Sequence, residues 1–360
     1  MANGGRSARF DQRDEGDTVA GSALSIERPG VRGVPPLRVA VVGAGGWGAQ
    51  HARMITERVD TELVAIVGRD RGRTEARAAA YGTRAYTSIA RMLETEHPDL
   101  VTVSLPNEEH FAPTLELLRA GVPLLVEKPL VFDLAEADAL LEAAGDTFFG
   151  INFNHRYAEP VLRARAAVQA GELGDLVFAT WRFGGEANRG PSPHANLIET
   201  QCHGFDMLEH LCGPIASVAA QMTTMTYGAF STVAIALEFT SGAVGTMLGS
   251  YDSSYAYPDT QRVELNGTAG RAVIHDTVRA LTLQSVGDET ERVWRPGYFD
   301  DEARSFERTA DRHLDAVLAA LRAGSPPPVP ASAGRRALEL AHAVIRSHET
   351  GARVPTLLAR

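Results

Sequence analysis

The stretch Val39 to Gly48 reads VAVVGAGGWG and decides the fold. Apolar residues typical of a buried strand lead into a glycine turn, and a helical pattern at 49–57 follows. Gly43, Gly45 and Gly48 have the G-x-G-x-x-G spacing of a dinucleotide-binding turn, in the strand-to-helix context that this motif requires. The first glycine allows the tight turn, the second lets the backbone approach a pyrophosphate, and the third permits close helix packing. We therefore expect a dinucleotide here, in contact with Gly43, Gly45, Gly46, Trp47 and Gly48.

The sequence after this turn alternates between strand-like and helix-like patterns. Short β-branched runs occur at 63–67, 100–105, 124–126 and 148–151, with helical patterns at 74–81, 111–120 and 134–144. Strands that alternate with helices at this spacing predict parallel βαβ units and a doubly wound sheet. Residues 37–151 are therefore expected to form a Rossmann dinucleotide-binding domain of the α/β class.

The pattern changes after about residue 152. Helical patterns at 162–170 and 197–211 are followed by strand-like runs at 177–183, 218–225, 232–239, 243–251, 261–266 and 272–275. Consecutive strands without helices between them predict a large, mostly antiparallel open sheet. Helical patterns at 306–322 and 335–348 close the chain, on either side of a proline-rich segment that no helix can cross. Residues 152–360 are expected to be an α+β domain for substrate binding and oligomerisation. The last two helices of this domain are able to pack back on the Rossmann domain.

Composition limits the classes of partner. The formal net charge of −10 disfavours nucleic acid and anionic membranes, because binding to phosphates needs clustered cations. No apolar segment has the length that spans a bilayer. Residues 1–36 are rich in Gly, Arg, Asp and Ser and are interpreted as a disordered leader. With two cysteines and no secretory pattern, the cytosol is the expected location, and a small molecule is the expected partner.

The identity of the dinucleotide is read about 20 residues past the glycines, at the end of the second strand. An acidic side chain there accepts from the ribose 2′-hydroxyl of NAD, but Gly68 stands at that place and Arg69 follows it. A guanidinium without a carboxylate favours the 2′-phosphate of NADP, with Arg71 and Arg73 as further cations. Asp70 competes with this interpretation, because a small shift of the turn would let it serve NAD. The sequence favours NADP(H) and leaves NAD(H) open.

Lys128 is the only lysine among 35 basic residues, in the segment VEKPL from Val126 to Leu130. Arginine stays protonated in proteins, whereas a lysine amine in a suitable environment is able to donate or accept a proton. The position is therefore a first candidate for chemistry. The alternative is that an arginine-rich composition left one lysine by chance.

A second candidate lies in the helical pattern at 197–211. Glu199, His203 and Asp206 fall at i, i+4 and i+7 and so share one helix face. An imidazole held by a carboxylate suits reversible proton transfer with a hydroxyl. Two alternatives remain: a structural buried histidine, or a metal site in which Asp206 or His210 joins the other two. We expect no metal, because zinc requires a firmer ligand set, and nothing marks Cys202 as an activated nucleophile.

Taken together, these motifs resemble the Gfo/Idh/MocA oxidoreductase family over residues 37–356. Further motifs of the resemblance, in order along the chain, are Leu105-Pro106-Asn107 with His110, Ala120-Gly121-Val122, Glu127-Lys128-Pro129-Leu130, Asn154-His155-Arg156-Tyr157, and the segments 171–175 and 266–270. The resemblance implies a Rossmann domain joined to an α/β domain, whose open sheet often forms the interface of a homodimer or homotetramer. It also implies hydride exchange between a nicotinamide ring and a secondary alcohol or ketone of a sugar, cyclitol or related molecule.

The resemblance also implies roles for single residues. Lys128 polarises or hydrogen-bonds the reacting oxygen, and His203 passes the proton with Glu199 as its acidic partner. Many members that look like inositol dehydrogenases carry Asp in the place of Glu199, so the longer side chain puts that contact in question. Pro129 in such motifs is commonly preceded by a cis peptide.

The remaining implied contacts divide between cofactor and substrate. The cofactor set beyond the glycine turn comprises Arg69, Arg73, Pro106, Asn107, His110, Glu127 and Lys128. The substrate set comprises Lys128, Asn154, Arg156, Phe183, Arg189, His203 and Asp206. Phe183 and Arg189 belong to a segment at 181–194 whose aromatic, amide and guanidinium groups suit a polyhydroxylated ligand. Ordinary turn and capping roles, or a surface loop that binds nothing, are the alternatives.

Two other functions are compatible with this fold. A glycosidase could hold NAD tightly, oxidise the sugar transiently and eliminate the aglycone without net redox change. Glycosidases of that type lack the lysine of the Glu-Lys-Pro motif, so Lys128 argues against this function. A non-catalytic dinucleotide sensor needs no proton-transfer pair, yet this chain retains one. The sequence therefore favours an NADP-preferring oxidoreductase that acts on a sugar, glycoside or cyclitol.

Overall fold

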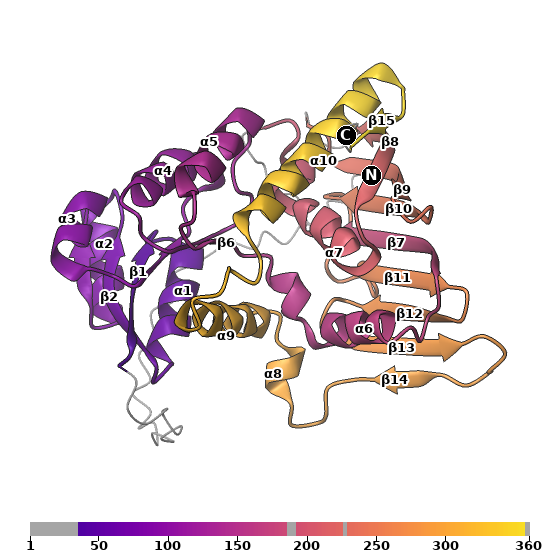
Figure 1. Cartoon of the computed structure of the whole chain (residues 1–360), viewed down its shortest axis with the longest axis horizontal. Coiled ribbons are helices and arrows are strands. Elements are labelled where there is room, and N and C mark those ends of the chain that lie inside the picture. Colours follow the sequence, from indigo (N-terminus) through magenta and orange to yellow (C-terminus); the bar gives the residue numbers. More distant parts are fainter. Residues whose placement is uncertain (1–34, 186–191, 226–228, 357–360) are drawn as a thin grey trace, which may run out of the picture. The chain divides into compact units, whose positions relative to one another are not determined.

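Two sheets organise the protein (Figure 1). The computed structural model describes residues 35–185, 192–225 and 229–356. The expected leader up to residue 34, and Arg189 of the expected substrate set, lie outside the described residues. The first sheet has the strand order β3-β2-β1-β4-β5-β6, and the second has the order β14-β13-β12-β11-β7-β10-β9-β8-β15.

All paired strands of the first sheet run parallel. Its strands are β1 (Leu37–Val42), β2 (Thr61–Val67), β3 (Arg84–Tyr86), β4 (Leu100–Val103), β5 (Leu124–Val126) and β6 (Phe149–Ile151). The helices between them are α1 (Gly46–Thr56), α2 (Arg71–Ala80), α3 (Ile89–Glu96), α4 (Phe111–Arg119) and α5 (Leu134–Ala144). The predicted doubly wound sheet is confirmed, and its strand order reverses between β1 and β4, where such sheets bind ligands.

The second sheet is mixed but mostly antiparallel. Its strands are β7 (Leu176–Gly184), β8 (Ile215–Thr223), β9 (Thr232–Phe239), β10 (Val244–Ser250), β11 (Gln261–Gly267), β12 (Gly270–His275), β13 (Ala280–Ser285), β14 (Arg292–Trp294) and β15 (Val354–Pro355). Among the described strand pairs of this second sheet, only β10 with β7 is parallel. The predicted large, mostly antiparallel sheet is therefore confirmed.

Helices complete the second half of the chain. They are α6 (Glu159–Gln169), α7 (Cys202–Cys212), α8 (Asp301–Arg304), α9 (Arg308–Arg322) and α10 (Ala331–Thr350), with short helical turns η1 (Asn107–Glu109), η2 (Asn154–Tyr157) and η3 (Asn196–Thr200). Three of the long helices, α6, α7 and α10, pack on one face of the second sheet.

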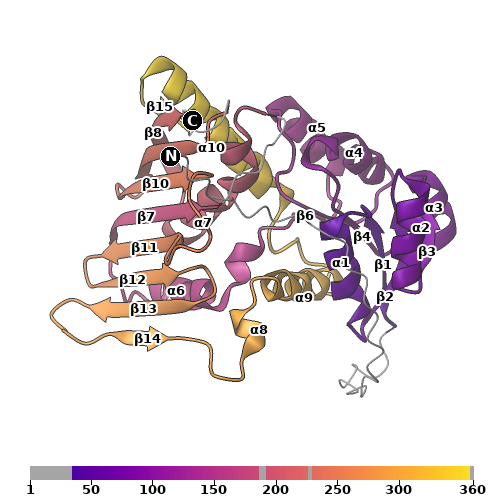
Figure 2. The same cartoon turned by 180° about the vertical axis from the view of Figure 1, so that it is seen from behind.

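Alternation of side chains explains why this sheet has one covered face. In β9, Val233, Ile235 and Leu237 are buried while the alanines between them are exposed. Successive residues of a strand point to opposite faces, so the apolar set lies under the helices. Figure 2 shows the other face of the sheet, with the strands nearer the viewer than α6 and α7. That face exposes Phe178, Val244 and Leu248 by 39%, 55% and 43%.

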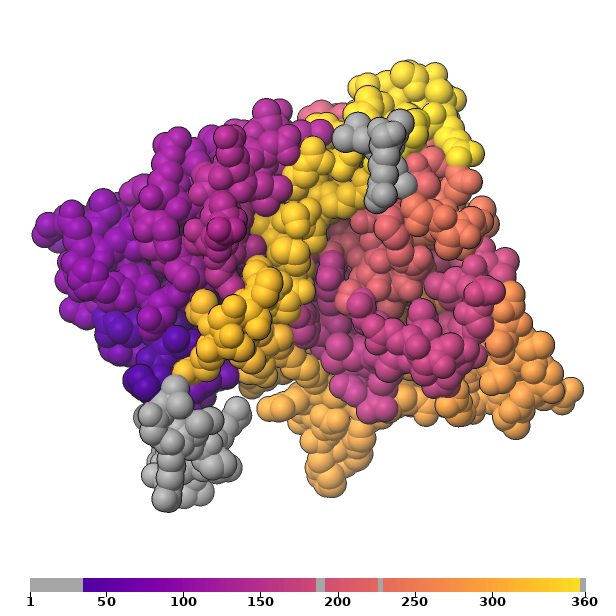
Figure 3. Space-filling view, in the orientation of Figure 1, coloured from indigo at the N-terminus to yellow at the C-terminus, as the bar shows by residue number. Residues whose placement is uncertain are grey.

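The last two helices contact the Rossmann sheet. Ala310, Leu314 and Val317 of α9 belong to the same buried cluster as Val39 and Val41 of β1. Helix α10 contacts α5 and β6 as well as α7 and β8, and it crosses between the purple and the red residues in Figure 3. These contacts place α9 beside the site described below.

No helix in the described ranges is both long and apolar enough to cross a membrane. The cytosolic location stays a prediction. The domain boundaries at 36 and 151 also stay predictions, since residues 35–360 form one compact unit by their internal contacts.

Candidate active site

The glycine turn joins β1 to α1 in a form that only glycine allows. Gly43 has φ +136°, and a Cβ there would lie 2.2 Å from the carbonyl oxygen of Ser104. A Cβ on Gly48 would lie 1.9 Å from the carbonyl oxygen of Gly43. Backbone amides at the start of α1 therefore remain open to a phosphate group. The turn fits a dinucleotide pyrophosphate.

A pocket of about 380 Å³ adjoins this turn. Its lining includes Gly43, Gly45, Gly46, Trp47, Arg69, Asp70, Arg73, Ser104, Pro106 and Glu109. Trp47 is 43% exposed and stands in the turn itself. The structure thus brings most of the cofactor set expected at this end to one cavity.

The charges at the end of β2 are partly engaged with the protein. Arg69 Nη2 lies 2.8 Å from Oε1 of Glu109, although the Arg69 side chain is 79% exposed. Asp70 accepts a hydrogen bond from the backbone amide of Arg73 at 2.7 Å and so caps α2. Because the cap uses one oxygen of Asp70, this carboxylate is less free to serve a ribose hydroxyl. The expected Arg69 cation is present but already has a carboxylate partner.

Lys128 follows β5 at the carboxyl edge of the Rossmann sheet. Its Nζ donates a hydrogen bond to the backbone carbonyl of Glu199 at 3.2 Å. The peptide between Lys128 and Pro129 is cis, as the family resemblance implied. A residue of the Rossmann sheet therefore meets the segment that precedes α7.

The expected single helix at 197–211 is wrong in its first turns. Residues Asn196–Thr200 form a π-helix, closed by the amide of Gln201 on the carbonyl of Asn196 at 3.0 Å. The spacing i, i+4, i+7 assumes a regular α-helix, so it does not by itself place Glu199 beside His203 here. Buried polar contacts explain the wider turn. Gln201 Oε1 accepts from Trp181 Nε1 at 3.1 Å, and its amide donates to Asn196 Oδ1 at 3.2 Å.

The implied hydrogen bond between Glu199 and His203 is not formed. Glu199 Oε1 and His203 Nδ1 are both buried, and neither has a hydrogen-bond partner within the described ranges. Burial raises the pKa of Glu199, although the Asn107 side chain and the Lys128 charge act to lower it. Asn107 therefore lies beside Glu199, and its contact with a cofactor stays a prediction.

His203 lies face to face with a second imidazole. The rings of His155 and His203 stack with centroids 3.9 Å apart and an interplanar angle of 13°. Burial lowers the pKa of His155 to about 3 and takes the pKa of His203 well below its ordinary value, with the Lys128 charge acting in the same direction. A neutral His203 has a nitrogen lone pair that can accept a proton.

The expected substrate residues around η2 are largely engaged within the protein. Arg156 forms a two-contact ion pair with the buried carboxylate of Asp206, at 2.8 Å from Nε. Asn154 donates from its amide to Thr309 of α9 at 2.7 Å. Phe183 is buried with its ring centroid 5.9 Å from that of His155. These side chains shape the site and hold α9 against η2.

The residues of the metal alternative are engaged within the protein. Asp206 gives both carboxylate oxygens to Arg156, and the Arg165 guanidinium lies against His210. No cluster of three metal-ligating side chains occurs in the ranges that the structure describes. Burial also raises the pKa of the Cys202 thiol to about 12, as in a buried thiol that is not activated.

Two residues that the resemblance placed at the cofactor, Glu127 and His110, are buried and form hydrogen bonds within the protein. Glu127 is buried, and its Oε1 accepts from Asn152 at 2.6 Å and lies 2.9 Å from Nε2 of His51. These partners outweigh desolvation, so the pKa of Glu127 is lowered. His110 is buried with its ring nitrogens 2.8 Å and 3.0 Å from the carbonyl oxygens of Pro129 and Leu105. Glu127 and His110 thus position the loops that carry Lys128 and Asn107.

Sequence reasoning missed three residues of the site. His51 lies on the buried face of α1 and could have been found from its place one turn after Gly48. His155 lies in the motif Asn154-His155-Arg156-Tyr157, in which the resemblance implied substrate roles only for Asn154 and Arg156. Gln201 gave no signal, because its role depends on Trp181 of β7, which is remote in sequence.

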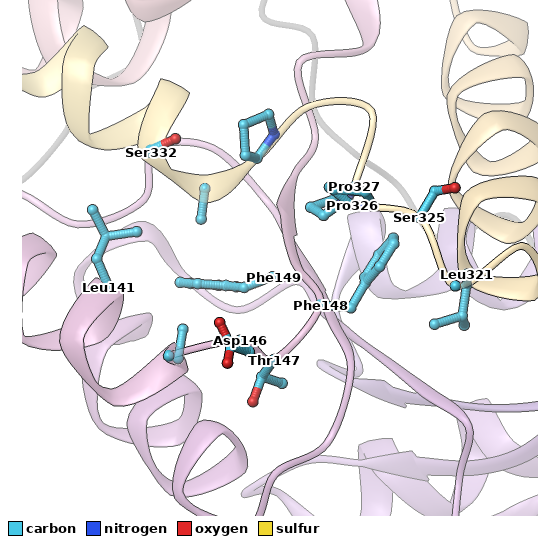
Figure 4. A pocket seen from close by; sticks show the side chains of 15 residues that line it. Leu141, Asp146, Thr147, Phe148, Phe149, Leu321, Ser325, Pro326, Pro327 and Ser332 are labelled. Carbon is cyan, nitrogen blue, oxygen red and sulfur yellow. The ribbon is translucent and has the colours of Figure 1, made fainter.

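A second pocket, of about 490 Å³, lies beside the start of β6 (Figure 4). Phe148, Phe149, Pro326 and Pro327 are among its lining residues. It shares none of the site residues and lies at the opposite edge of the sheet from the glycine turn, because parallel strands share one direction. We assign it no part in the chemistry.

The buried neutral histidines should make the protein acid-labile. The pKa of His313, which lies 2.7 Å from Asn152 Oδ1, is lowered by burial to about 3, as is that of His155. Unfolded histidines bind protons below pH 6.5 while the folded ones do not, so stability falls as pH falls below that value. Each should remove about 2 kcal/mol of unfolding free energy between pH 7 and pH 5. Urea unfolding at both pH values measures the loss.

His313→Asn should lose about 2 kcal/mol less than wild type over this interval. The exposed His97, whose φ of 45° also suits asparagine, is the matched control as His97→Asn. The control should lose as much stability as wild type. An equal loss in wild type and His313→Asn would contradict the assignment of His313 as a buried neutral ring.

Two family models match the chain. The model described as oxidoreductase family, NAD-binding Rossmann fold, matches residues 37–147, and the GFO/IDH/MocA C-terminal domain matches residues 161–273. Together they cover more than half of the chain.

Named relatives and a solved structure agree with the models. Inositol 2-dehydrogenase of Rhizobium meliloti (strain 1021) is 27% identical over 330 residues, 86% of this chain and 96% of that protein. D-glucoside 3-dehydrogenase of Escherichia coli (strain K12) is 33% identical over 151 residues, 41% of this chain and 43% of that protein. A probable dehydrogenase from Thermotoga maritima superposes with a TM-score of 0.75 at 25% identity, over 89% of this chain and 99% of that one. The chain belongs to the GFO/IDH/MocA oxidoreductase family.

Proposed function

We propose that the protein is an NAD(P)-dependent dehydrogenase or ketoreductase for a secondary alcohol or ketone of a sugar, glycoside or cyclitol. The observation that carries the proposal is the meeting of the Lys128 ammonium with the segment that holds Glu199 and His203. This meeting occurs at the edge of the sheet that also carries the glycine turn. The relatives named inositol 2-dehydrogenase and D-glucoside 3-dehydrogenase support the substrate class.

Each group of the site has a part in the reaction. A bound nicotinamide supplies the hydride acceptor or donor. Lys128 stabilises the negative charge that develops on the reacting oxygen, and its hydrogen bond to the Glu199 carbonyl fixes the ammonium. Neutral His203 accepts the hydroxyl proton in oxidation and returns it in reduction. Arg156, held by Asp206, and Phe183 shape the substrate side.

NADP is the dinucleotide that we propose as preferred. Arg69 and Arg73 line the cofactor pocket, and Asp70 there uses one of its two oxygens as the cap of α2. The competing group is Glu109, which pairs with Arg69 and would have to release it to a 2′-phosphate. The proposal therefore attributes dinucleotide preference to the balance between Arg69 and Glu109.

The open face of the second sheet is the proposed contact between copies of the chain, as a homodimer or homotetramer. Phe178 of β7 lies beside Val244 of β10 in the parallel register, and Leu248 follows on the same face. An exposed apolar stripe on a sheet face commonly marks an interface. Arg182 and Arg262 lie beside this stripe and supply a polar border.

Lys128→Met should lower kcat by about 10² to 10⁴ fold, because it removes the charge that stabilises the reacting oxygen. The measurement is nicotinamide absorbance change over a panel of sugars, glycosides and cyclitols, with thermal unfolding and dinucleotide binding as controls for folding. Equal turnover in wild type and variant would refute the proposed role of Lys128. Aglycone release from a glycoside without net absorbance change would favour the glycosidase. Dinucleotide binding without any turnover would favour the sensor.

Arg69→Ala should lower kcat/KM with NADP about tenfold, near 1.4 kcal/mol, and leave NAD nearly unchanged. Glu109→Gln should act in the opposite direction, because it frees the Arg69 guanidinium for a phosphate. Arg279→Ala, which breaks an exposed ion pair with Asp276 in the turn between β12 and β13, is the control. A wild-type enzyme that prefers NAD, or no response to Arg69→Ala, would reject NADP preference alone.

Phe178→Glu should convert the assembly to monomers, because a desolvated carboxylate opposes an apolar contact. Light scattering after size-exclusion chromatography gives the mass directly, against 38.6 kDa for one chain. Val286→Glu is the matched control, since Val286 is 72% exposed beyond the end of β13. A monomeric wild type, or dimers that survive Phe178→Glu, would reject this interface.

A further inference from the structure

The stacked imidazole of His155 has no part in the mechanism so far. His155 is 2% exposed, and its Nδ1 is buried without a hydrogen-bond partner among the described residues. Its ring covers one face of His203 at 3.9 Å, nearly parallel. Phe306, which precedes α9, meets the His155 ring edge-on at 4.9 Å. The titratable side chain of His155 is thus buried against His203, the proposed proton acceptor.

The groups around His203 come from five elements. Phe153, just before η2, contacts it edge-on at 5.8 Å, and His155 of η2 stacks on it. Lys128 after β5 acts on it as a positive charge. Glu199 of η3 lies on the preceding turns with its Oε1 unpartnered, and Asp206 of α7 is neutralised by Arg156. Trp181 and Phe183 of β7 lie behind His155.

We propose that His155 is a positioning residue for the proton-transfer step. Its ring excludes water from one face of His203 and fixes the ring plane, so that His203 stands as the free base opposite the substrate hydroxyl. The inference rests on the proposed function and deepens it. Only the reacting groups exchange atoms in oxidation. The hydroxyl proton moves to His203. The carbon that bears this hydroxyl gives up a hydride with its electron pair, which a bound nicotinamide would accept, and a carbonyl remains.

Physical reasons indicate that the stacked ring of His155 keeps His203 in its neutral form. A ring held flat at van der Waals distance replaces water on that face of His203. Without that water, the protonated form of His203 loses solvation that the neutral form does not need. The nearby Lys128 charge opposes protonation of either ring. Burial lowers the pKa of both histidines, so the stack remains neutral over the range in which the enzyme would work.

Two substitutions distinguish the effect of the stacked ring of His155 from the effect of its titratable nitrogens. His155→Phe keeps a flat ring but removes the nitrogens, whereas His155→Ala removes the ring and admits water. The acid limb of kcat/KM against pH should keep its position in His155→Phe and move up by about one pH unit or more in His155→Ala. kcat at neutral pH should fall about tenfold in His155→Ala, because the ring plane is no longer fixed. His97→Asn is the control variant.

A second readout does not depend on turnover. NMR titration of the His203 ring in ¹⁵N-histidine-labelled protein should show a higher pKa in His155→Ala than in wild type or His155→Phe. An unmoved acid limb and an unmoved His203 titration in a folded His155→Ala protein would overturn the proposal. Equal shifts in both variants would overturn stacking in favour of the nitrogens of His155. A wild type whose His203 titrates as expected but which turns over no substrate would overturn the proposed function, and with it the catalytic meaning of the stack.

Discussion

The hydrogen bond from Lys128 Nζ to the carbonyl oxygen of Glu199 is the interaction on which the site depends. It joins the end of a Rossmann strand to a π-helix in the second half of the chain. The π-helix presents the carbonyl oxygen of Glu199, which also accepts from Cys202 Sγ at 3.4 Å. Irregular helical turns of this kind occur often at functional sites. Here the irregularity has a cause, because the buried amide of Gln201 is held by Trp181 and Asn196.

The electrostatics of the site follow from burial more than from paired charges. Glu199 and His203 each have an unpartnered buried atom, and the pKa of Glu199 is raised while that of His203 is lowered. Both groups are therefore driven toward their neutral forms. Lys128 supplies the positive charge beside them. A site in which a cation lies beside a neutral imidazole suits a reaction in which negative charge develops on an oxygen and a proton leaves it.

Sequence patterns predicted the architecture because periodicity and glycine spacing are local properties. The turn from Gly43 to Gly48 and the alternation in β9 depend on neighbours along the chain, and both were predicted. The three residues of β3 were missed because their pairing depends on β2 and not on their own composition. The same limit applies to the site. Lys128 and His203 were found from residue type, but the π-helix depends on contacts with β7 that no local pattern records.

A chain of buried hydrogen bonds connects α1 to the segment that carries Lys128. His51 of α1 contacts Glu127, Glu127 accepts from Asn152, and Asn152 lies 2.7 Å from Nδ1 of His313 on α9. Glu127 is the residue before Lys128, so α1, which begins at the glycine turn, and the peptide that carries the Lys128 ammonium share one network. A buried polar network stabilises only when its members are satisfied, because removal of one leaves the others desolvated without partners. The geometry between the glycine turn and Lys128 is therefore set in part by this buried network, which is why Glu127 matters to the site through its bonds within the protein.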